Sequence, residues 1–579
     1  MVAQNLTDRI NEELSSLRAL TQDTARAYFI DADNKRRIIR LLRFGAVGFE
    51  FRPSQNFHVF AELYSQVIDK FMLNPEVSVK NNFRSWVEMR ETLEAFDLTF
   101  NFYANATSLQ KAMMQSNISD QAELALKPMM CLSLDKLDLV NIDELIALMP
   151  NLQSSQILLS VMKTRYHFAI PEHKLSMLVD RFIESAPDEM HALSIQTNTF
   201  FFSSYWSSES ANDFKKAVCA GIPRTKNQYN LEAATSRNTR KQRLLITHER
   251  YKPNASMVRS WGKVYDLLES HFEVTHLLTG TDGGCIHPGK DTFFGPVENT
   301  EEAEEIIKKI RPDVIFLPSV GMGRINFYLA NQRLAKLQVA GLGHPVTYAG
   351  REIDRIIVSW PIPSIDSHHQ VLDSIPITFP TIFKDIEVNY PLNPNSQIVS
   401  VYAKVQKLSR DFLLMLLSVQ EFAPDIKFQF LAGEVSLNHL AVKASLERFG
   451  FNDVTVFPNL DYDRVLEVLS KSLCSIAPYP FGGWDSVVDV CHVGIPHVAV
   501  VSDNPGSTDQ HFLRHLGLSD RVFDDRAELI AYVSRLASEP EFFKFEARRS
   551  KLAFETIRSE SSTPFSEVQK DRIISTFSV

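Results

Sequence analysis

Short apolar runs alternate with amphipathic helical segments from residue 398 onward. The runs rich in β-branched residues lie at 398–402, 426–431, 453–457, 473–477 and 497–501, and helical spacing follows at 409–422, 436–449, 461–471, 485–493 and 508–516. Neighbouring parallel strands require a crossover connection, which is usually a helix. The order therefore predicts an α/β domain with a doubly wound parallel sheet and helices on both faces.

The same alternation occurs earlier in the chain, before a proline-rich interval at 363–396. Its strand-like runs are 243–248, 313–318, 337–342 and 354–360. The segment 301–310 between them has leading glutamates and trailing lysines, the charge order that a helix dipole favours. We therefore expect two doubly wound, Rossmann-like domains that face each other.

The N-terminal part of the chain shows helical spacing instead. Apolar residues recur every three or four positions in segments such as 10–20, 140–148 and 175–183. A basic and polar segment at 224–243 is typical of a solvated linker between domains. The predicted organisation is an all-α domain at 1–230 followed by Rossmann-like domains at 240–385 and 390–579.

Charge and cysteine content exclude several classes of partner. The chain has 61 Lys and Arg against 70 Asp and Glu, a formal net charge of −9, so general affinity for nucleic acid or anionic lipid is not expected. No apolar run approaches the roughly 20 residues that span a bilayer, and the start lacks the pattern of a signal peptide. Five scattered cysteines without a C-x-x-C pair fit reduced thiols, so a cytoplasmic location is predicted.

The stretch PYPFGGWDSVVDVCHVGIP (478–496) leaves a predicted strand through two glycines and enters a helix. In doubly wound sheets, ligands bind where the carboxyl ends of strands meet helix N-termini. Gly482 and Gly483 let the backbone approach a ligand closely, and Asp489 can accept a hydrogen bond from a ribose hydroxyl. Amides of the first helical turn favour an anion such as a diphosphate; they belong to Trp484, Asp485 and Ser486. The alternative of a simple turn with a solvated Asp489 stays open on spacing alone.

Basic and imidazole side chains follow other predicted strands. Lys404 and Lys407 lie after the first strand of the second sheet, and either ammonium group can neutralise phosphate charge, although most loop lysines are only solvated. His248 and His344 follow strands of the first sheet; each can transfer a proton, although a structural, hydrogen-bonded histidine is the commoner case. No G-x-G-x-x-G, P-loop or H-E-x-x-H motif occurs, which argues against NAD enzymes, NTPases and zinc peptidases, and no metal site is predicted.

Two stretches of this sequence resemble a known family. LPSVGMGRINFYLANQRLAKLQVAGLGHPVT (317–347) and the stretch 478–496 are similar to bacterial cytoplasmic N-glucosyltransferases that modify high-molecular-weight adhesins. These belong to glycosyltransferase family 41, together with the eukaryotic protein O-GlcNAc transferase. The resemblance extends over about 240–540, and its most specific parts are Asn331-Gln-Arg-Leu-Ala, Gly343-His-Pro, and Phe481-Gly followed by Asp489.

The resemblance implies a GT-B-type fold, with the acceptor on the domain 240–385 and the UDP-sugar on the domain 390–579. It implies a metal-independent, inverting transfer of a hexose, with UDP-glucose as donor and no further cofactor. The acceptor would be a protein side chain, asparagine in Asn-X-Ser/Thr, in a polypeptide such as a surface adhesin.

The resemblance also assigns roles to individual residues. The register of QKLSR places Lys407 where the family binds the diphosphate, and the ribose-binding aspartate falls on Asp489. The helix start at Tyr462 lies where the family holds the uracil. The phosphate-binding helix start falls on Gly483, Trp484 and Asp485.

Two positions depart from the family pattern. A family histidine expected after the first strand is replaced by Pro253 or Asn254, although His248 lies a few residues earlier. Asp485 stands where the adhesin-modifying enzymes have a neutral asparagine, and a carboxylate beside a diphosphate is unfavourable unless it points away or caps the helix. These departures leave two alternatives open: a transferase acting on a glycan or Ser/Thr acceptor, and a catalytically inactive scaffold that binds UDP.

Overall fold

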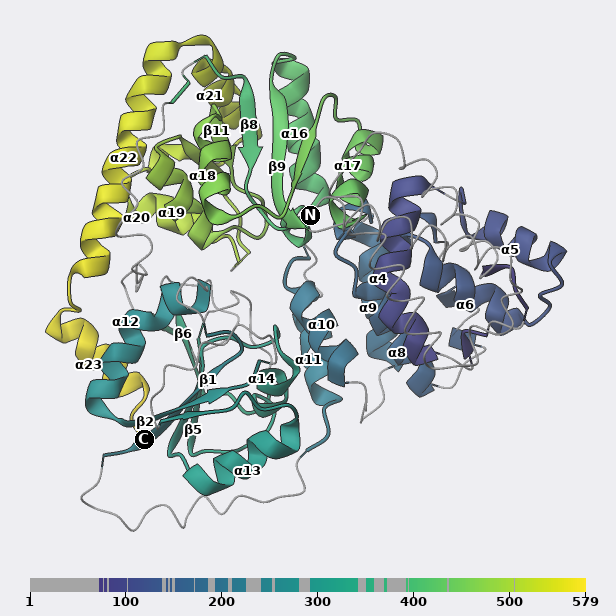
Figure 1. Cartoon of the computed structure of the whole chain (residues 1–579), viewed down its shortest axis with the longest axis horizontal. Coiled ribbons are helices and arrows are strands. Elements are labelled where there is room, and N and C mark those ends of the chain that lie inside the picture. The colour runs from purple at the N-terminus through teal and green to yellow at the C-terminus, as the bar shows by residue number, and fades with distance from the viewer. Residues whose placement is uncertain are drawn as a thin grey trace, which may run out of the picture. The chain divides into compact units, whose positions relative to one another are not determined.

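The computed structural model describes most of the chain from residue 72 onward (Figure 1). It covers residues 72–579 except 76–77, 81–82, 102, 138–141, 144–145, 148–150, 171, 186–192, 207–210, 225–240, 252–255, 281–291, 342–349, 359–368, 372–391, 394, 435–436 and 505. The chain forms two compact units. The first unit consists of Met1–Leu178 and Ser400–Val465, and the second of Val179–Val399 and Leu466–Val579.

Within the described residues, every regular element before Arg243 is a helix, as the sequence predicts. Asn105 and Asp120 begin two of these helices, because their side chains accept hydrogen bonds from amides of the first turn. The predicted helix 175–183 is confirmed, whereas 10–20 lies outside the described residues. The helices are α4 (Phe83–Phe100), α5 (Ala106–Gln115), α6 (Gln121–Cys131), α8 (Asn151–Met162), α9 (Glu172–Ser185), α10 (Leu193–Ser203) and α11 (Ala211–Ala220).

The first sheet has seven strands in the order β3-β2-β1-β4-β5-β6-β7, and every adjacent pair is parallel. Because all strands run the same way, their carboxyl ends meet at one edge, and β1 and β4 are neighbours there. The strands are β1 (Arg243–His248), β2 (Glu273–Leu278), β3 (Phe293–Phe294), β4 (Val314–Leu317), β5 (Leu337–Gly341), β6 (Arg355–Val358) and β7 (His369–Val371).

One face of this sheet is covered by α12 (Ser256–His271) and by the last helix, α23 (Glu567–Thr576), which lie side by side in Figure 1. Leu244 and Ile246 of β1 are buried in a single apolar cluster with Trp261 of α12 and Phe577 after α23. The end of the chain therefore completes the core of a sheet that begins more than half the chain earlier.

Helices α13 (Thr300–Ile310) and α14 (Arg324–Leu329) lie after β3 and β4. Asn299 begins α13 by accepting a hydrogen bond from the Glu302 amide. Phe327 of α14 packs against Phe200 of α10, with ring centroids 4.8 Å apart. Helix α10, although part of the predicted all-α domain, thus packs directly on the first α/β domain.

The second sheet has six strands in the order β10-β9-β8-β11-β12-β13. The strands are β8 (Ile398–Val401), β9 (Lys427–Glu434), β10 (Thr455–Pro458), β11 (Cys474–Ile476), β12 (His497–Val500) and β13 (Val522–Phe523). The helices between them are α16 (Arg410–Phe422), α17 (Leu437–Phe449), α18 (Tyr462–Ser470), α19 (Trp484–Val493) and α20 (Thr508–His515). All five strands and all five helices predicted from residue 398 onward are confirmed to within a few residues.

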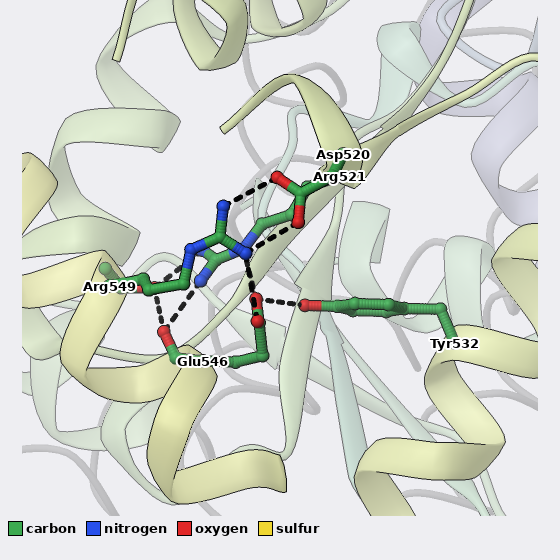
Figure 2. A network of polar contacts seen from close by, with 6 residues as sticks. Asp520, Arg521, Tyr532, Glu546 and Arg549 are labelled. Atoms are coloured by element: carbon green, nitrogen blue, oxygen red, sulfur yellow. Dashed lines mark hydrogen bonds and ion pairs between the residues drawn. The ribbon is translucent and has the colours of Figure 1, made fainter. Parts of the chain in front are cut away.

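A buried polar network joins the end of this sheet to α21 (Arg526–Ser538) and α22 (Pro540–Ser562) (Figure 2). Arg521, which is fully buried, donates from Nε to Glu546 Oε2 at 2.8 Å. Tyr532 donates its hydroxyl to the same carboxylate at 2.6 Å. Arg549 forms a bidentate pair with Asp520, both distances being 2.6 Å, and this pair lowers the pKa of Asp520. Within this network the Arg521 guanidinium and the Glu546 carboxylate compensate each other's charge, which offsets part of the cost of removing both from water.

The predicted fold class is confirmed: two parallel, helix-covered sheets follow a helical region. Among the residues that the structure describes, every helix is too short or too polar to span a lipid bilayer.

Candidate functional site

The loop between β11 and α19 is held in place by a carboxylate from α20. Asp509, which is buried, accepts a hydrogen bond from the Gly483 amide through Oδ2. Its Oδ1 lies 2.8 Å from Nε2 of the buried His497 on β12. The Gly482 amide donates to the Gly506 carbonyl at 2.8 Å. The two glycines are therefore fixed from two sides at the point where α19 begins.

A side chain at Gly482 would displace the Asp509 carboxylate from its present position. A Cβ atom at this position would overlap the Asp509 carboxylate and lie 3.1 Å from the Asp509 amide nitrogen. Gly483 is the N-cap residue of α19 and, having no side chain, provides no side-chain cap. The N-cap residue therefore supplies no carboxylate or hydroxyl group to accept hydrogen bonds from amides of the first turn. This arrangement is suited to an anionic ligand.

Aromatic packing orients both ends of this turn. Trp484 stacks on Phe512 of α20, with ring centroids 4.6 Å apart and an interplanar angle of 13°. Phe481 packs against Tyr205, which follows α10, at a centroid distance of 4.5 Å. Ser486 is half-buried on the first turn of α19. The sequence signals the glycines and the helix start, but it does not signal Tyr205, which comes from a distant helical segment.

Asp485 and Asp489 of α19 lie on the same side of the helix and share one cation. Arg259, in the first turn of α12, donates from Nη2 to Asp489 Oδ1 at 3.3 Å. Its Nε lies 3.6 Å from Asp485 Oδ1. The side chains of Arg259 and Asp489 are 7% and 2% exposed, whereas that of Asp485 is 29% exposed. Asp489 is thus a buried, ion-paired carboxylate. The alternative that it is a solvated helix residue is wrong.

Lys407 and Tyr462 belong to the first unit. Lys407 ends the 3-10 helix η5 (Val405–Lys407) after β8, and its amide donates to the Lys404 carbonyl at 2.9 Å. Ser409 follows as N-cap of α16, accepting from the Phe412 amide at 3.1 Å. Lys407 therefore has a backbone fixed on both sides. Tyr462 is the first residue of α18, as predicted, and is half-buried.

A buried glutamate joins two loops at the carboxyl edge of the first sheet. Glu249, directly after β1, accepts hydrogen bonds from the Ser319 hydroxyl and, at 2.7 Å, from the Gly323 amide. Ser319 and Gly323 flank the loop between β4 and α14. Burial raises the pKa of Glu249 to about 7, even though these two hydrogen bonds act in the opposite direction. Glu249 was visible in the sequence only as the residue next to His248.

The pKa of Glu249 makes stability depend on pH. In the folded chain Glu249 keeps its proton up to about pH 7, whereas its ordinary pKa is 4.5. The unfolded chain therefore binds fewer protons between pH 4.5 and 7, and the contribution of Glu249 to stability falls as pH rises through this window. The quantity to compare is the free energy of unfolding of the wild type minus that of the Glu249→Gln variant. We expect this difference to fall by about 3 kcal/mol as the pH rises through this window.

Denaturant titrations of both proteins at several pH values measure this difference. Other buried groups, such as Glu94, whose pKa is also raised to about 7, are present in both proteins and cancel. A difference that does not change with pH would contradict a protonated Glu249.

His248 lies under α12 in an aromatic environment. Its Nε2 is 2.9 Å from Nδ1 of His276, whose Nε2 is 3.2 Å from the Glu269 carboxylate. Tyr265 of α12 packs edge-on against the His248 ring, with ring centroids 5.2 Å apart. Burial, together with His276, holds the pKa of His248 well below its ordinary value of 6.5, so the ring is neutral. These contacts are those of a packed, hydrogen-bonded histidine; a proton-transfer role for His248 stays a prediction.

His344 lies outside the described residues, as do Pro253 and Asn254. Within the described ranges, no group of three or more His, Cys, Asp or Glu side chains is arranged to hold a metal ion. Of the predicted site residues, those from Gly482 to Asp489 lie together at the start of α19, with Arg259 and Asp509 as additions that the sequence did not indicate.

Comparison with known proteins finds a sequence match over 253 residues. The UDP-glucose:protein N-beta-glucosyltransferase of Actinobacillus pleuropneumoniae serotype 5b is 24% identical over this length, as is the protein of the same name from serotype 7. The match covers 41% of this chain and 40% of the serotype 5b protein, so it spans only about two-fifths of that relative. No protein-family model matches the chain.

Comparison with solved structures supports the fold over a greater length. A mutant O-GlcNAc transferase of Thermobaculum terrenum superimposes with a TM-score of 0.58, covering 86% of this chain and 96% of that one. Its sequence is 12% identical, so this likeness concerns the fold. The predicted resemblance is confirmed: the chain is similar in sequence to bacterial UDP-glucose:protein N-glucosyltransferases and has the GT-B-type fold, with a helical N-terminal region, of an O-GlcNAc transferase.

Proposed function

We propose that this chain is a UDP-sugar-dependent glycosyltransferase that modifies protein. Its donor is UDP-glucose, and its acceptor is the asparagine side chain of Asn-X-Ser/Thr. The observation that carries this proposal is the match over 253 residues to a UDP-glucose:protein N-beta-glucosyltransferase. The start of α19 supports it, because a helix N-terminus capped only by glycine, with a buried aspartate one turn later, has the chemistry to bind a diphosphate and a ribose.

The proposed reaction is a single displacement with inversion. The acceptor amide nitrogen forms a bond to the anomeric carbon from the face opposite UDP. The bond between that carbon and the diphosphate oxygen breaks, and its electron pair leaves with UDP. The nitrogen releases one proton, which passes to water. Because negative charge develops on UDP, donors and cations aimed at the diphosphate lower the barrier.

Individual residues have separate roles in this proposal. The backbone amides of the first turn of α19, from Trp484 onward, bind the diphosphate beside Gly482 and Gly483, and Asp489 accepts a hydrogen bond from the ribose. Lys407 supplies an ammonium group to the departing diphosphate, and Tyr462 begins the helix that holds the uracil. No metal ion or further cofactor takes part.

The acceptor and the compartment complete the proposal. The acceptor is an unfolded or extended segment of a polypeptide, with a bacterial surface adhesin as one candidate. The reaction takes place in the cytoplasm, which fits the four cysteines that the structure describes as free, all of them buried.

A donor panel tests this function directly. The full chain is incubated with UDP-glucose, UDP-galactose, UDP-N-acetylglucosamine or GDP-mannose and an Asn-X-Thr peptide, and mass spectrometry measures the peptide. We expect one hexose to be added from UDP-glucose, and none to a matched peptide in which glutamine replaces the asparagine.

Two results would contradict the proposal in different ways. Addition to the glutamine control through its Thr would change the acceptor to a hydroxyl group. Binding of UDP without transfer from any donor would favour an inactive UDP-binding scaffold, the alternative that Asp485 and the replaced histidine leave open.

A further inference from the structure

The buried guanidinium of Arg259 is the feature that the proposed function does not use. It comes from α12, whereas both of its carboxylate partners come from α19, 230 positions away in the case of Asp489. Nη2 contacts Asp489 and Nε faces Asp485, so a single planar group serves both side chains. Arginine is suited to this because its guanidinium has five donors in a fixed geometry and stays charged.

The two aspartates create a problem for an anionic ligand at the start of α19. They occupy the first two turns of the helix, and Asp489 is almost fully buried. Because the Arg259–Asp489 pair is removed from water, solvent and salt screen its charges only weakly. Without a nearby cation, two carboxylates would repel a diphosphate at the same helix start and offset the attraction of the helix dipole.

We infer that Arg259 is a positioning residue for the donor: its guanidinium offsets part of the negative charge of Asp485 and Asp489 and thereby lets the start of α19 accept the diphosphate of a UDP-sugar. This inference rests on the proposed function, since it concerns the same nucleotide.

The test compares the binding of UDP and of uridine to the full chain by calorimetry. We expect Arg259→Met to weaken UDP binding by at least about tenfold, because truncating one member of a buried charge pair leaves its partner uncompensated. Uridine lacks the diphosphate and meets this site only through the ribose, so its affinity should fall by less than that of UDP. Adding Asp485→Asn to Arg259→Met removes one carboxylate and should restore part of the lost UDP affinity.

A matched control lies one turn further along the same helix. Lys263 donates to the Glu560 carbonyl, and its ammonium group lies over the Phe565 ring, so Lys263→Met should leave UDP affinity unchanged. Thermal unfolding of each variant without nucleotide reports whether it is folded. If Arg259→Met does not fold, the single variant Asp485→Asn tests the inference instead. It should bind UDP more tightly than the wild type and bind uridine with unchanged affinity. A UDP affinity equal to that of the wild type would overturn the inference.

The remaining outcomes separate this inference from the proposed function. If the wild type does not bind UDP, the proposed function fails, and the inference fails with it. If the wild type binds UDP and Arg259→Met binds it equally well or more tightly, only the inference is overturned. An equal loss of UDP and uridine affinity would also overturn it, because that result would indicate a general structural role.

Discussion

Replacing Lys407 by alanine should lower the rate of sugar transfer by about two to three orders of magnitude, the typical effect of removing one group that stabilises charge in the transition state. In the proposed reaction, Lys407 stabilises the negative charge that develops on the departing UDP. Its side chain leaves a 3-10 helix whose backbone is fixed by local hydrogen bonds, so alanine should not disturb the fold. Transfer to the Asn-X-Thr peptide, measured at saturating UDP-glucose, gives the effect on kcat.

Lys404 provides the matched comparison within the same loop. Its ammonium group donates to the Gly433 carbonyl at 2.7 Å, so it already has a backbone acceptor in the structure. Lys404→Ala should therefore cause a much smaller loss of rate than Lys407→Ala. The reverse order would move the diphosphate assignment to Lys404, and equal, unimpaired rates would remove both lysines from the proposed site.

Replacing Arg521 by methionine should lower the free energy of unfolding by about 3–5 kcal/mol, because it leaves the buried Glu546 carboxylate without its main cationic partner. Arg521 is fully buried and donates three hydrogen bonds, to the Glu546 side chain, the Glu546 carbonyl and Ser550 (Glu546 and Arg521 appear in Figure 2). Chemical denaturation at neutral pH measures the change.

Two further variants distinguish charge burial from lost packing. Adding Glu546→Gln to Arg521→Met removes the buried negative charge and should recover part of the lost stability. Arg535→Met breaks an exposed pair with Glu539 and should cost less than about 0.5 kcal/mol. If the double variant is no more stable than Arg521→Met, packing of the arginine, and not its charge, holds α21 and α22 to the sheet.

The sequence predicted the strands and helices of the second sheet from β8 to α20, whose apolar patterns are local. The strands β8 to β12 contain β-branched runs bounded by polar residues, and this pattern is strong enough to be read locally. Strand β2 was missed because Glu273, Thr275 and His276 interrupt its apolar pattern. Helix α23 was missed because only a few of its residues are buried, and they are buried by partners from α12 and the first sheet.

The candidate site likewise combines features that the sequence predicted with features that only the tertiary structure showed. Gly482, Gly483 and the helix start were predictable, because glycine pairs and a switch from strand to helix are local signals. The conflict between a side chain at position 482 and the Asp509 carboxylate was not predictable, since Asp509 lies on another helix. The burial of Asp489 was equally hidden: its spacing fits a solvated helix position, and only the approach of Arg259 makes it an ion-paired group.

The sequence by itself determined the two-sheet α/β class, the position of the glycine-led helix start and the likeness to protein N-glucosyltransferases, because these depend on periodicity and on contiguous motifs. Only the tertiary structure decided the charge balance at that helix start, the lowered pKa of His248 and the raised pKa of Glu249. The physical reason is that the cost of burying a charge depends on which distant groups surround it, and no local pattern of residues specifies those neighbours.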